Sequence, residues 1–443
     1  MDETITAITD AITIGDCNEI ERLLAPLNPA EIAHVLNALP ADERAFLFEY
    51  VPEGLNGEVL LHMGEVAAAD LAKDLDAHTL LKATDVMDTA DIAELLEVLP
   101  EESADKLLKG MDAQRRERIE INLSFEEGTA GRLMHTDAIT VRSDVTLQTL
   151  QRYLRRYTEV PEDTDMLMVV DRDNHLQGTI SILSLVLHPP DKAVTEVMKD
   201  DVRTLSPDTP EHEVIRIFED HDLVSAPVVD QAGYFLGRVV VDDIIDSMRD
   251  EADHAMLSPV GLKDDEDLFA PMLPSARRRT VWLAVNLGTA LLASWVIGQF
   301  EATLDKIVAL AVLMPIVASM GGIAGSQTLT LTIRGLTMGQ VVSNNSRWLL
   351  KKEMGIGMLN GVLWALVVAL IALLWFKSWQ IGMVIGAALT LNMLAAALAG
   401  ILVPVAFHRM KIDPALAGAV VLTTVTDVVG FMAFLGLATI FLL

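Results

Sequence analysis

Long apolar runs dominate the last third of the chain and predict helices that cross a membrane. Each run is close to the length of about 20 residues that a helix needs to span roughly 30 Å of hydrocarbon. Charged residues lie between the runs, apart from Asp427 in the last one. The pattern predicts a transmembrane domain of five helices in residues 281–443, at roughly 281–299, 307–333, 354–376, 381–407 and 415–441.

The charges between these runs predict how the bundle is oriented. Basic residues precede the first run and separate the second from the third and the fourth from the fifth, whereas the opposite loops carry few. Cytoplasmic loops carry the excess of Lys and Arg in membrane proteins. We therefore expect the N-terminal half to be cytoplasmic and the C-terminus to lie outside. The basic positions are Arg277, Arg278, Arg279, Arg334, Arg347, Lys351, Lys352, Arg409 and Lys411, with His408 beside them.

Residues 1–128 show short amphipathic patterns punctuated by Pro, Asp and Asn, as expected of small helices. The segment PAEIAHVLNALPADE at 29–43 is echoed by TADIAELLEVLPEES at 89–103, with Ile32 matching Ile92. Repeated helix pairs stack into superhelical arrays. The sequence thus predicts an all-α, superhelical N-terminal domain.

A second duplication follows in the next 120 residues or so. LMHTDAITVRSDVTLQTL, from Leu133, aligns with VMKDDVRTLSPDTPEHEV, from Val197. Each copy shows the pattern strand, helix, strand, turn, strand, helix. This resembles a pair of CBS (cystathionine β-synthase) domains, which we place at 129–195 and 196–252. Such pairs often bind adenine nucleotides, so the resemblance makes ATP a candidate ligand.

The charge of the chain is divided unevenly. It has 33 basic and 63 acidic residues, of which only 11 and 5 lie at or after residue 276, so the part before carries −36 and the part after +6. An acidic region of this size repels nucleic acid and anionic surfaces and favours cations, although acidity also simply keeps a domain soluble. The single cysteine, Cys17, excludes an intrachain disulfide. The acidic N-terminus predicts no cleaved signal peptide.

Asp427 is the most informative single residue. An ionised Asp within a spanning helix costs roughly 2.5–3.5 kcal/mol and marks an ion or proton path by default. Three explanations are open: a protonated acid, an acid bonded to the hydroxyls of Thr423, Thr424 and Thr426, or a carboxylate visited by a cation. A hard ion such as Mg²⁺ needs only one or two carboxylates because it keeps much of its water.

Two further stretches are compatible with cation chemistry, and each also has a purely structural explanation. In the second run, Gly321, Gly322 and Gly325 would let backbone carbonyls approach a path, but a Gly-x-x-x-Gly spacing also marks plain helix packing. Before the first run, Asp246, Asp250, Glu251 and Asp253 lie on one predicted helix. Such acids either share bound cations or form a solvated face.

The order of motifs is similar to that of the MgtE family of magnesium channels and transporters, over essentially the whole chain. The motifs are FEEGTAGRLM, the CBS pair, the acidic linker, GGIAGSQTLTLTIRGL, KIDPALAG and TTVTDVVG. The resemblance implies a homodimer whose pore lies between two membrane domains, with Asp427 binding hydrated Mg²⁺ and Thr423 giving a backbone ligand. Many members have Asn within a Gly-Gly-Asn motif where this chain has Ile323.

The resemblance also implies regulation. Intracellular Mg²⁺ would bind acidic clusters of the cytoplasmic domains, and a connecting plug helix, placed at 253–280, would close the pore. The matching candidates are Asp246, Asp250, Glu251 and Asp253, together with Asp413 of the DPAL motif.

We therefore expect a multi-pass inner-membrane protein that is not an enzyme and that admits Mg²⁺ down its electrochemical gradient until intracellular Mg²⁺ closes it. Its expected partners are the lipid bilayer, Mg²⁺ and a second copy of the chain, with no nucleic acid. No GxxxxGK[ST] nucleotide loop is present to drive pumping. The alternatives are a CBS-domain membrane sensor that transports nothing and a proton-coupled carrier that uses Asp427.

Overall fold

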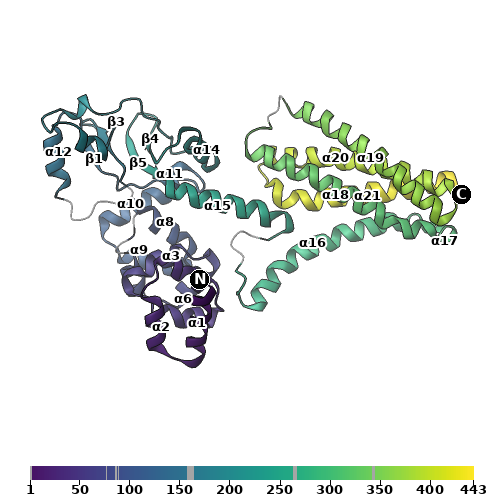
Figure 1. Ribbon diagram of the computed structural model, residues 1–443, viewed down its shortest axis with the longest axis horizontal. Coiled ribbons are helices and arrows are strands. Elements are labelled where there is room, and N and C mark those ends of the chain that lie inside the picture. Colours follow the sequence, from purple (N-terminus) through teal and green to yellow (C-terminus); the bar gives the residue numbers. More distant parts are fainter. Residues whose placement is uncertain are drawn as a thin grey trace. The chain divides into compact units, whose positions relative to one another are not determined.

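The computed structural model describes residues 2–75, 77–84, 87, 89–156, 164–262, 267–341 and 345–443. They form two compact units, which are described separately. The first unit comprises Met1–Ala252 and Asp265–Pro271, and the second comprises Asp253–Asp264 and Met272–Leu443. Figure 1 shows the first unit in purple to teal and the second mostly in green to yellow.

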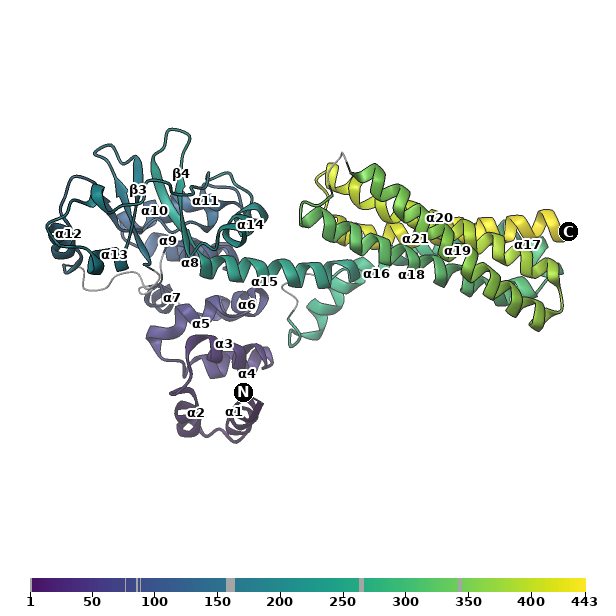
Figure 2. The same ribbon diagram turned by 45° about the horizontal axis from the view of Figure 1, so that its top comes forward.

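The first unit begins with the small helices that the sequence predicts. The repeated segments form the helix pairs α3–α4 and α8–α9, and the matched Ile32 and Ile92 are both fully buried. An Asn28 and Glu31 capping box starts α3. Figure 2 shows these helices stacked in pairs. The helices are α1 (Asp2–Ile14), α2 (Cys17–Leu24), α3 (Pro29–Asn37), α4 (Ala41–Phe48), α5 (Asn56–Leu61), α6 (Glu65–Asp74), α7 (Ala77–Ala83), α8 (Thr89–Val98), α9 (Glu101–Gly110), α10 (Ala113–Leu123) and α11 (Ala130–Leu133).

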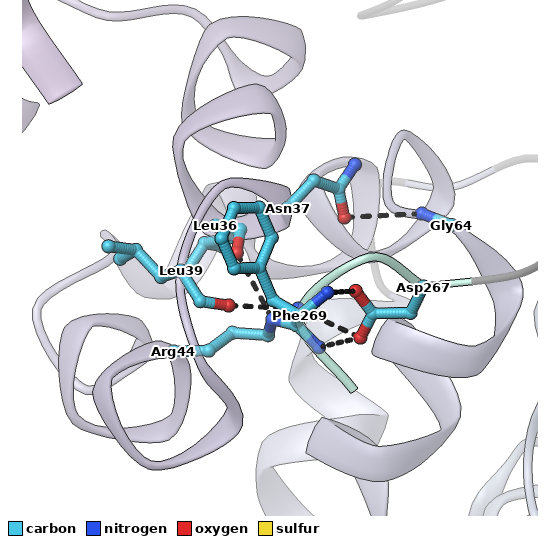
Figure 3. A network of polar contacts seen from close by, with 7 residues as sticks. All are labelled: Leu36, Asn37, Leu39, Arg44, Gly64, Asp267 and Phe269. Atoms are coloured by element: carbon cyan, nitrogen blue, oxygen red, sulfur yellow. Dashed lines mark hydrogen bonds and ion pairs between the residues drawn. The ribbon is translucent and has the colours of Figure 1, made fainter. Parts of the chain in front are cut away.

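A buried ion pair joins this helical domain to the short segment that precedes the first span in sequence (Figure 3). Both terminal nitrogens of Arg44 donate to Oδ2 of Asp267 at 3.0 Å, and the two side chains are only 2% and 8% exposed. Arg44 also donates to the carbonyls of Leu36 and Leu39. Its guanidinium therefore holds together the α3–α4 turn and a segment 223 residues further along the chain.

The CBS pair forms two small α/β layers. In the first copy, β1 (Thr140–Arg142), β2 (Met166–Val170) and β3 (Leu176–Ser181) make one sheet in that order, with β1 and β2 parallel and β2 and β3 antiparallel. Helices α12 (Leu147–Leu154) and α13 (Ile182–Leu187) complete it.

The second copy differs from the predicted pattern in its first strand. Antiparallel β4 (Ser225–Val229) and β5 (Phe235–Val240) form a two-stranded sheet beside α14 (Glu211–His221). The expected strand before α14 is only a single parallel bridge between Leu205 and Val228. Pro207 follows closely and lacks the N–H that a longer ladder would use.

The polypeptide leaves the second copy through α15 (Val241–Leu257), which follows β5 directly. The region 253–280, expected to hold the plug helix, contains the end of α15, a short 3-10 turn at Ser258–Val260 and the first turns of α16. Residues 263–266 within it lie outside the described residues.

The described residues of the second unit contain five helices that are long and apolar enough to cross a membrane, which confirms the predicted number. Figures 1 and 2 show α18 to α21 running alongside one another. Of the five, α20 is the most buried, and its many Gly and Ala residues permit close packing. The helices are α16 (Met272–Gly298), α18 (Ala309–Thr337), α19 (Ser346–Phe376), α20 (Trp379–Arg409) and α21 (Pro414–Leu442), with the short α17 (Glu301–Lys306) before α18.

Two of these helices begin earlier than the apolar runs. The helix α16 starts at Met272 and α19 at Ser346, so the basic residues that were assigned to loops lie in the first turns of helices. Lys and Arg are good helix formers, and their long stems let the charged group reach the membrane surface. Their basic ends still mark the same side of the bundle.

Candidate functional site

A groove of about 960 Å³ runs between α18 and α21, and Asp427 lies on its wall. The glycine-rich segment and the isolated acid, which the sequence marks separately, thus meet at one place, because Gly322 lines the same groove. The polar wall is completed by Ser319, Ser326, Gln327, Thr330 and Thr423. Such a wall offers oxygen atoms to a hydrated cation.

The threonines beside Asp427 do not bond to its carboxylate. Thr423 donates to the Ala419 carbonyl at 2.9 Å, Thr424 to Val420 at 2.7 Å, and Thr426 to the Thr423 carbonyl at 3.0 Å. In the described part of the chain, the Asp427 carboxylate has no hydrogen-bond or ion-pair partner. The explanation by hydroxyl pairing is therefore not supported, and the carboxylate faces the groove.

Ile323 occupies the groove wall one residue after Gly322, and its side chain is exposed. An isoleucine offers no side-chain oxygen at this position, where many members of the MgtE family, which the sequence resembles, have Asn. The nearest polar groups in sequence are Ser326 and Gln327, one turn along α18, which line the groove as well. They are the side-chain oxygens on α18 that lie next to Ile323 on the side toward Thr330.

Asp413 is the N-cap residue of α21. Its two oxygens accept from the backbone N–H groups of Ala415 at 2.8 Å and Leu416 at 3.2 Å. Nε2 of His254, near the end of α15, lies 3.2 Å from Asp413 Oδ2. The residue of α15 that contacts Asp413 is thus a histidine, next in sequence to the candidate Asp253.

In the first unit, Asp246 and Asp250 on α15 lie close to acids of α8, an arrangement that the sequence analysis missed. Loss of hydrating water around the Glu94 carboxyl raises its pKa to about 8, and the neighbouring charges of Asp91, Asp246, Asp243 and Asp250 add to the rise. The Glu94 side chain still reaches solvent. Glu251 and Asp253 are not among the principal charges that act on Glu94.

We call Asp91, Glu94, Asp243, Asp246 and Asp250 the acidic cluster. Across the described ranges, no three His, Cys, Asp or Glu side chains are close enough to form a ready metal cage. Mg²⁺ does not require one, since it keeps several waters and binds through one or two carboxylates. Mutual repulsion among accessible carboxylates suits a hydrated cation that bridges α8 and α15.

The acidic cluster gives a prediction for pH dependence. Because the folded-state pKa of Glu94 is raised above its ordinary value, the folded protein holds a proton that the unfolded chain releases between about pH 4.5 and 8, and stability falls as pH rises through that window. We expect Glu94→Gln to raise the melting temperature at pH 8 in a chelator, and to shrink the stabilisation that added Mg²⁺ gives.

The control for this prediction is Glu120→Gln, on the exposed side of α10. It should leave both the melting temperature and the response to Mg²⁺ unchanged. A Glu94→Gln protein that melts no higher than the wild type at pH 8 would contradict the repulsion.

Glu353 is a second functional candidate that the sequence analysis missed. It lies in α19, one position before the predicted run, and is only 5% exposed. Thr328 donates to it at 3.4 Å and Lys352 Nζ lies 3.5 Å away. It lines a cavity of about 180 Å³ that shares Gln327 with the groove. Its position at the edge of the apolar run was the available signal.

Known families match the chain in the order in which these domains occur. Residues 27–128 match the MgtE intracellular N domain, residues 130–189 and 194–250 match the CBS domain, and residues 314–437 match the MgtE family, described as divalent cation transporter. The last match contains both walls of the groove.

Whole relatives align over nearly their full length. A magnesium transporter MgtE of Bacillus subtilis is 27% identical over 100% of this chain and 98% of its own, and one of Thermus thermophilus is 29% identical over 98% of each. A solved structure of the cytosolic domain of the Mg²⁺ channel MgtE in complex with ATP shares 28% identity, covers 55% of this chain and 99% of its own, and has a TM-score of 0.52.

These matches agree with the spans, the CBS pair and the cytosolic helical domain. Mg²⁺ is the transported ion of the family, which is one of transporters rather than enzymes. The chain belongs to the MgtE family of divalent cation transporters, as a multi-pass membrane protein with cytosolic N-terminal domains.

Proposed function

We propose that the protein is a gated pathway through which Mg²⁺ enters the cell down its electrochemical gradient. The observation that carries the proposal is the Asp427 carboxylate, which faces a polar groove without a partner among the described residues. An unpaired acid at this depth is costly unless a cation or proton visits it. An oxygen-lined groove suits a hydrated hard cation.

Asp427 would hold the ion through its bound water, and the Thr423 carbonyl would give a backbone contact one turn away. A single chain offers one such acid. A homodimer, with grooves facing each other in the inner membrane and both C-termini outside, would surround the ion with two. An inside-negative potential supplies about 4.6 kcal/mol per 100 mV for a divalent ion, so entry needs no other energy source.

We propose that the acidic cluster senses intracellular Mg²⁺. Bound Mg²⁺ would relieve the repulsion between α8 and α15 and stabilise the closed state, to the extent that it binds that state more tightly. Glu251, Asp253 and Asp413 are further candidate ligands near the plug region 253–280. The contact of Asp413 with His254 joins the end of α15 to the N-terminal end of α21.

ATP is a candidate ligand of the CBS pair. The support is the ATP complex of the related cytosolic domain. Calorimetric titration of the purified chain with ATP, with and without Mg²⁺, tests this separately from transport.

Flux into liposomes tests the gating. With the purified protein in vesicles, we expect Mg²⁺ flux to fall when Mg²⁺ on the side of the cytosolic domains is raised. The variant Glu94→Gln/Asp246→Asn/Asp250→Asn should respond to a different Mg²⁺ concentration. Flux that does not depend on Mg²⁺ on that side would contradict the sensing role of the acidic cluster. The absence of any flux would favour a CBS-domain membrane protein that senses a ligand and transports nothing.

A further inference from the structure

The side chain of Asn392 lies between the two helices that form the groove. It projects from α20, is fully buried, and its Nδ2 donates to the Val317 carbonyl of α18 at 2.9 Å. In the membrane, such amides link helices because lipid offers them no partner. Neither its sequence setting nor the proposed pathway accounts for it.

Glycines meet the amide from both groove helices. A Cβ placed on Gly321 of α18 would lie 2.1 Å from Asn392 Nδ2, and one on Gly430 of α21 would lie 2.7 Å from the same atom. Both distances are far below ordinary contact, so a side chain at either position would require the Asn392 amide to move. Gly321 immediately precedes the groove residue Gly322, and Gly430 follows Asp427 by three positions.

The amide also leaves one atom unsatisfied. In the described part of the chain, Asn392 Oδ1 is buried without a hydrogen-bond partner. Buried polar atoms are nearly always bonded, and an orphan acceptor calls for an explanation. An apolar side chain of the same volume would fill the space equally, whereas the amide adds a hydrogen bond to α18.

We propose that Asn392 is a positioning residue that sets the spacing of α18 and α21, and with it the width of the groove at Asp427. The amide fills the space that the two glycines leave and ties itself to α18 through Val317. Groove width helps decide which hydrated cations pass. The inference rests on the proposed Mg²⁺ pathway and adds to it a determinant of selectivity that lies behind the groove.

The experiment compares Gly430→Ala, Asn392→Ala and the double variant in proteoliposomes. The methyl of Gly430→Ala should strike the amide and lower Mg²⁺ flux by about tenfold, because small residues set helix approach. Asn392→Ala should change the ratio of Ca²⁺ to Mg²⁺ flux by about threefold or more, since groove dimensions set selectivity. In the double variant the new methyl occupies vacated space, so flux should exceed that of Gly430→Ala.

The matched control is Gly386→Ala, on α20 like Asn392 but facing α19 at ordinary contact distance. It should change neither flux nor ratio. Melting temperatures of all variants separate a loss of folding from a change in groove width. A double variant no better than Gly430→Ala, or an unchanged ion ratio in folded Asn392→Ala, would overturn the proposal.

A second readout does not depend on flux. Thr330 lines the groove, so a Thr330→Cys protein in a Cys17→Ser background reports how fast small and bulky thiol reagents enter. Asn392→Ala should change the ratio of the two rates. A ratio that is the same with and without Asn392 would overturn the positioning role. If wild-type flux does not depend on Asp427, the proposed pathway itself is wrong, whatever the thiol reagents show.

Discussion

Replacing Asp427 by alanine should lower Mg²⁺ flux by about 100-fold, because a charged hydrogen-bonding group contributes up to about 3 kcal/mol and each 1.36 kcal/mol is about tenfold in rate. Among the described residues, Asp427 is the one acid on the groove wall. Its removal takes away the charge that attracts a hydrated cation into the groove. The variant should still fold and insert, because no described side chain bonds to that carboxylate.

Asp427→Asn separates charge from shape. It keeps the size of the side chain, so we expect nearly the same loss as for alanine. Asp305→Asn is the matched control, because this acid lies in the short α17 and outside the groove. Tracer uptake into vesicles measures all three. Flux near the wild-type level in Asp427→Ala would mean that the groove is not part of the ion pathway.

Replacing Arg44 by alanine should destabilise the N-terminal helical domain by about 3–5 kcal/mol, the usual effect of breaking a buried ion pair. The loss leaves the Asp267 carboxylate buried beside α3 and α4, and the carbonyls of Leu36 and Leu39 lose a donor. Asp267→Ala should have a similar effect, because it leaves a buried guanidinium. The double variant should lose less than the sum of the two.

Urea unfolding of the full chain measures this effect, with protease cleavage within α3 and α4 as the readout. The control is Arg22→Ala, whose partner Glu19 is one turn away on an exposed surface. Exposed pairs of this kind contribute little, so the control should unfold like the wild type. Additive losses in the Arg44 and Asp267 double variant would mean that the two side chains do not act as a pair.

The apolar runs predict the membrane unit well because its physics is local. A run of sufficient length is enough to require a helix in lipid, and the described part of the chain contains five such helices. The beginnings of α16 and α19 were missed because their first turns are charged, and composition alone does not separate a loop from the polar end of a helix. The first strand of the second CBS copy depends on pairing beyond Leu205, which Pro207 limits.

The candidate site was predictable only in part. Asp427 is visible because a lone acid in an apolar run is anomalous by itself. Three other contacts join segments that are far apart in sequence. They are the approach of Asp246 to Glu94, the Arg44–Asp267 ion pair, and the packing of the Asn392 amide against glycines of α18 and α21. No local pattern marks such contacts, because each residue reads as an ordinary helix-surface charge or an ordinary polar interruption.

The most direct test of the central claim is Mg²⁺ uptake by wild-type proteoliposomes under an imposed inside-negative potential, with the pH gradient collapsed and Mg²⁺ low on the side of the cytosolic domains. A passive cation pathway predicts uptake that rises with the potential and persists without a pH gradient. Uptake that stops when the pH gradient is removed at fixed potential would contradict it and make Asp427 a proton site.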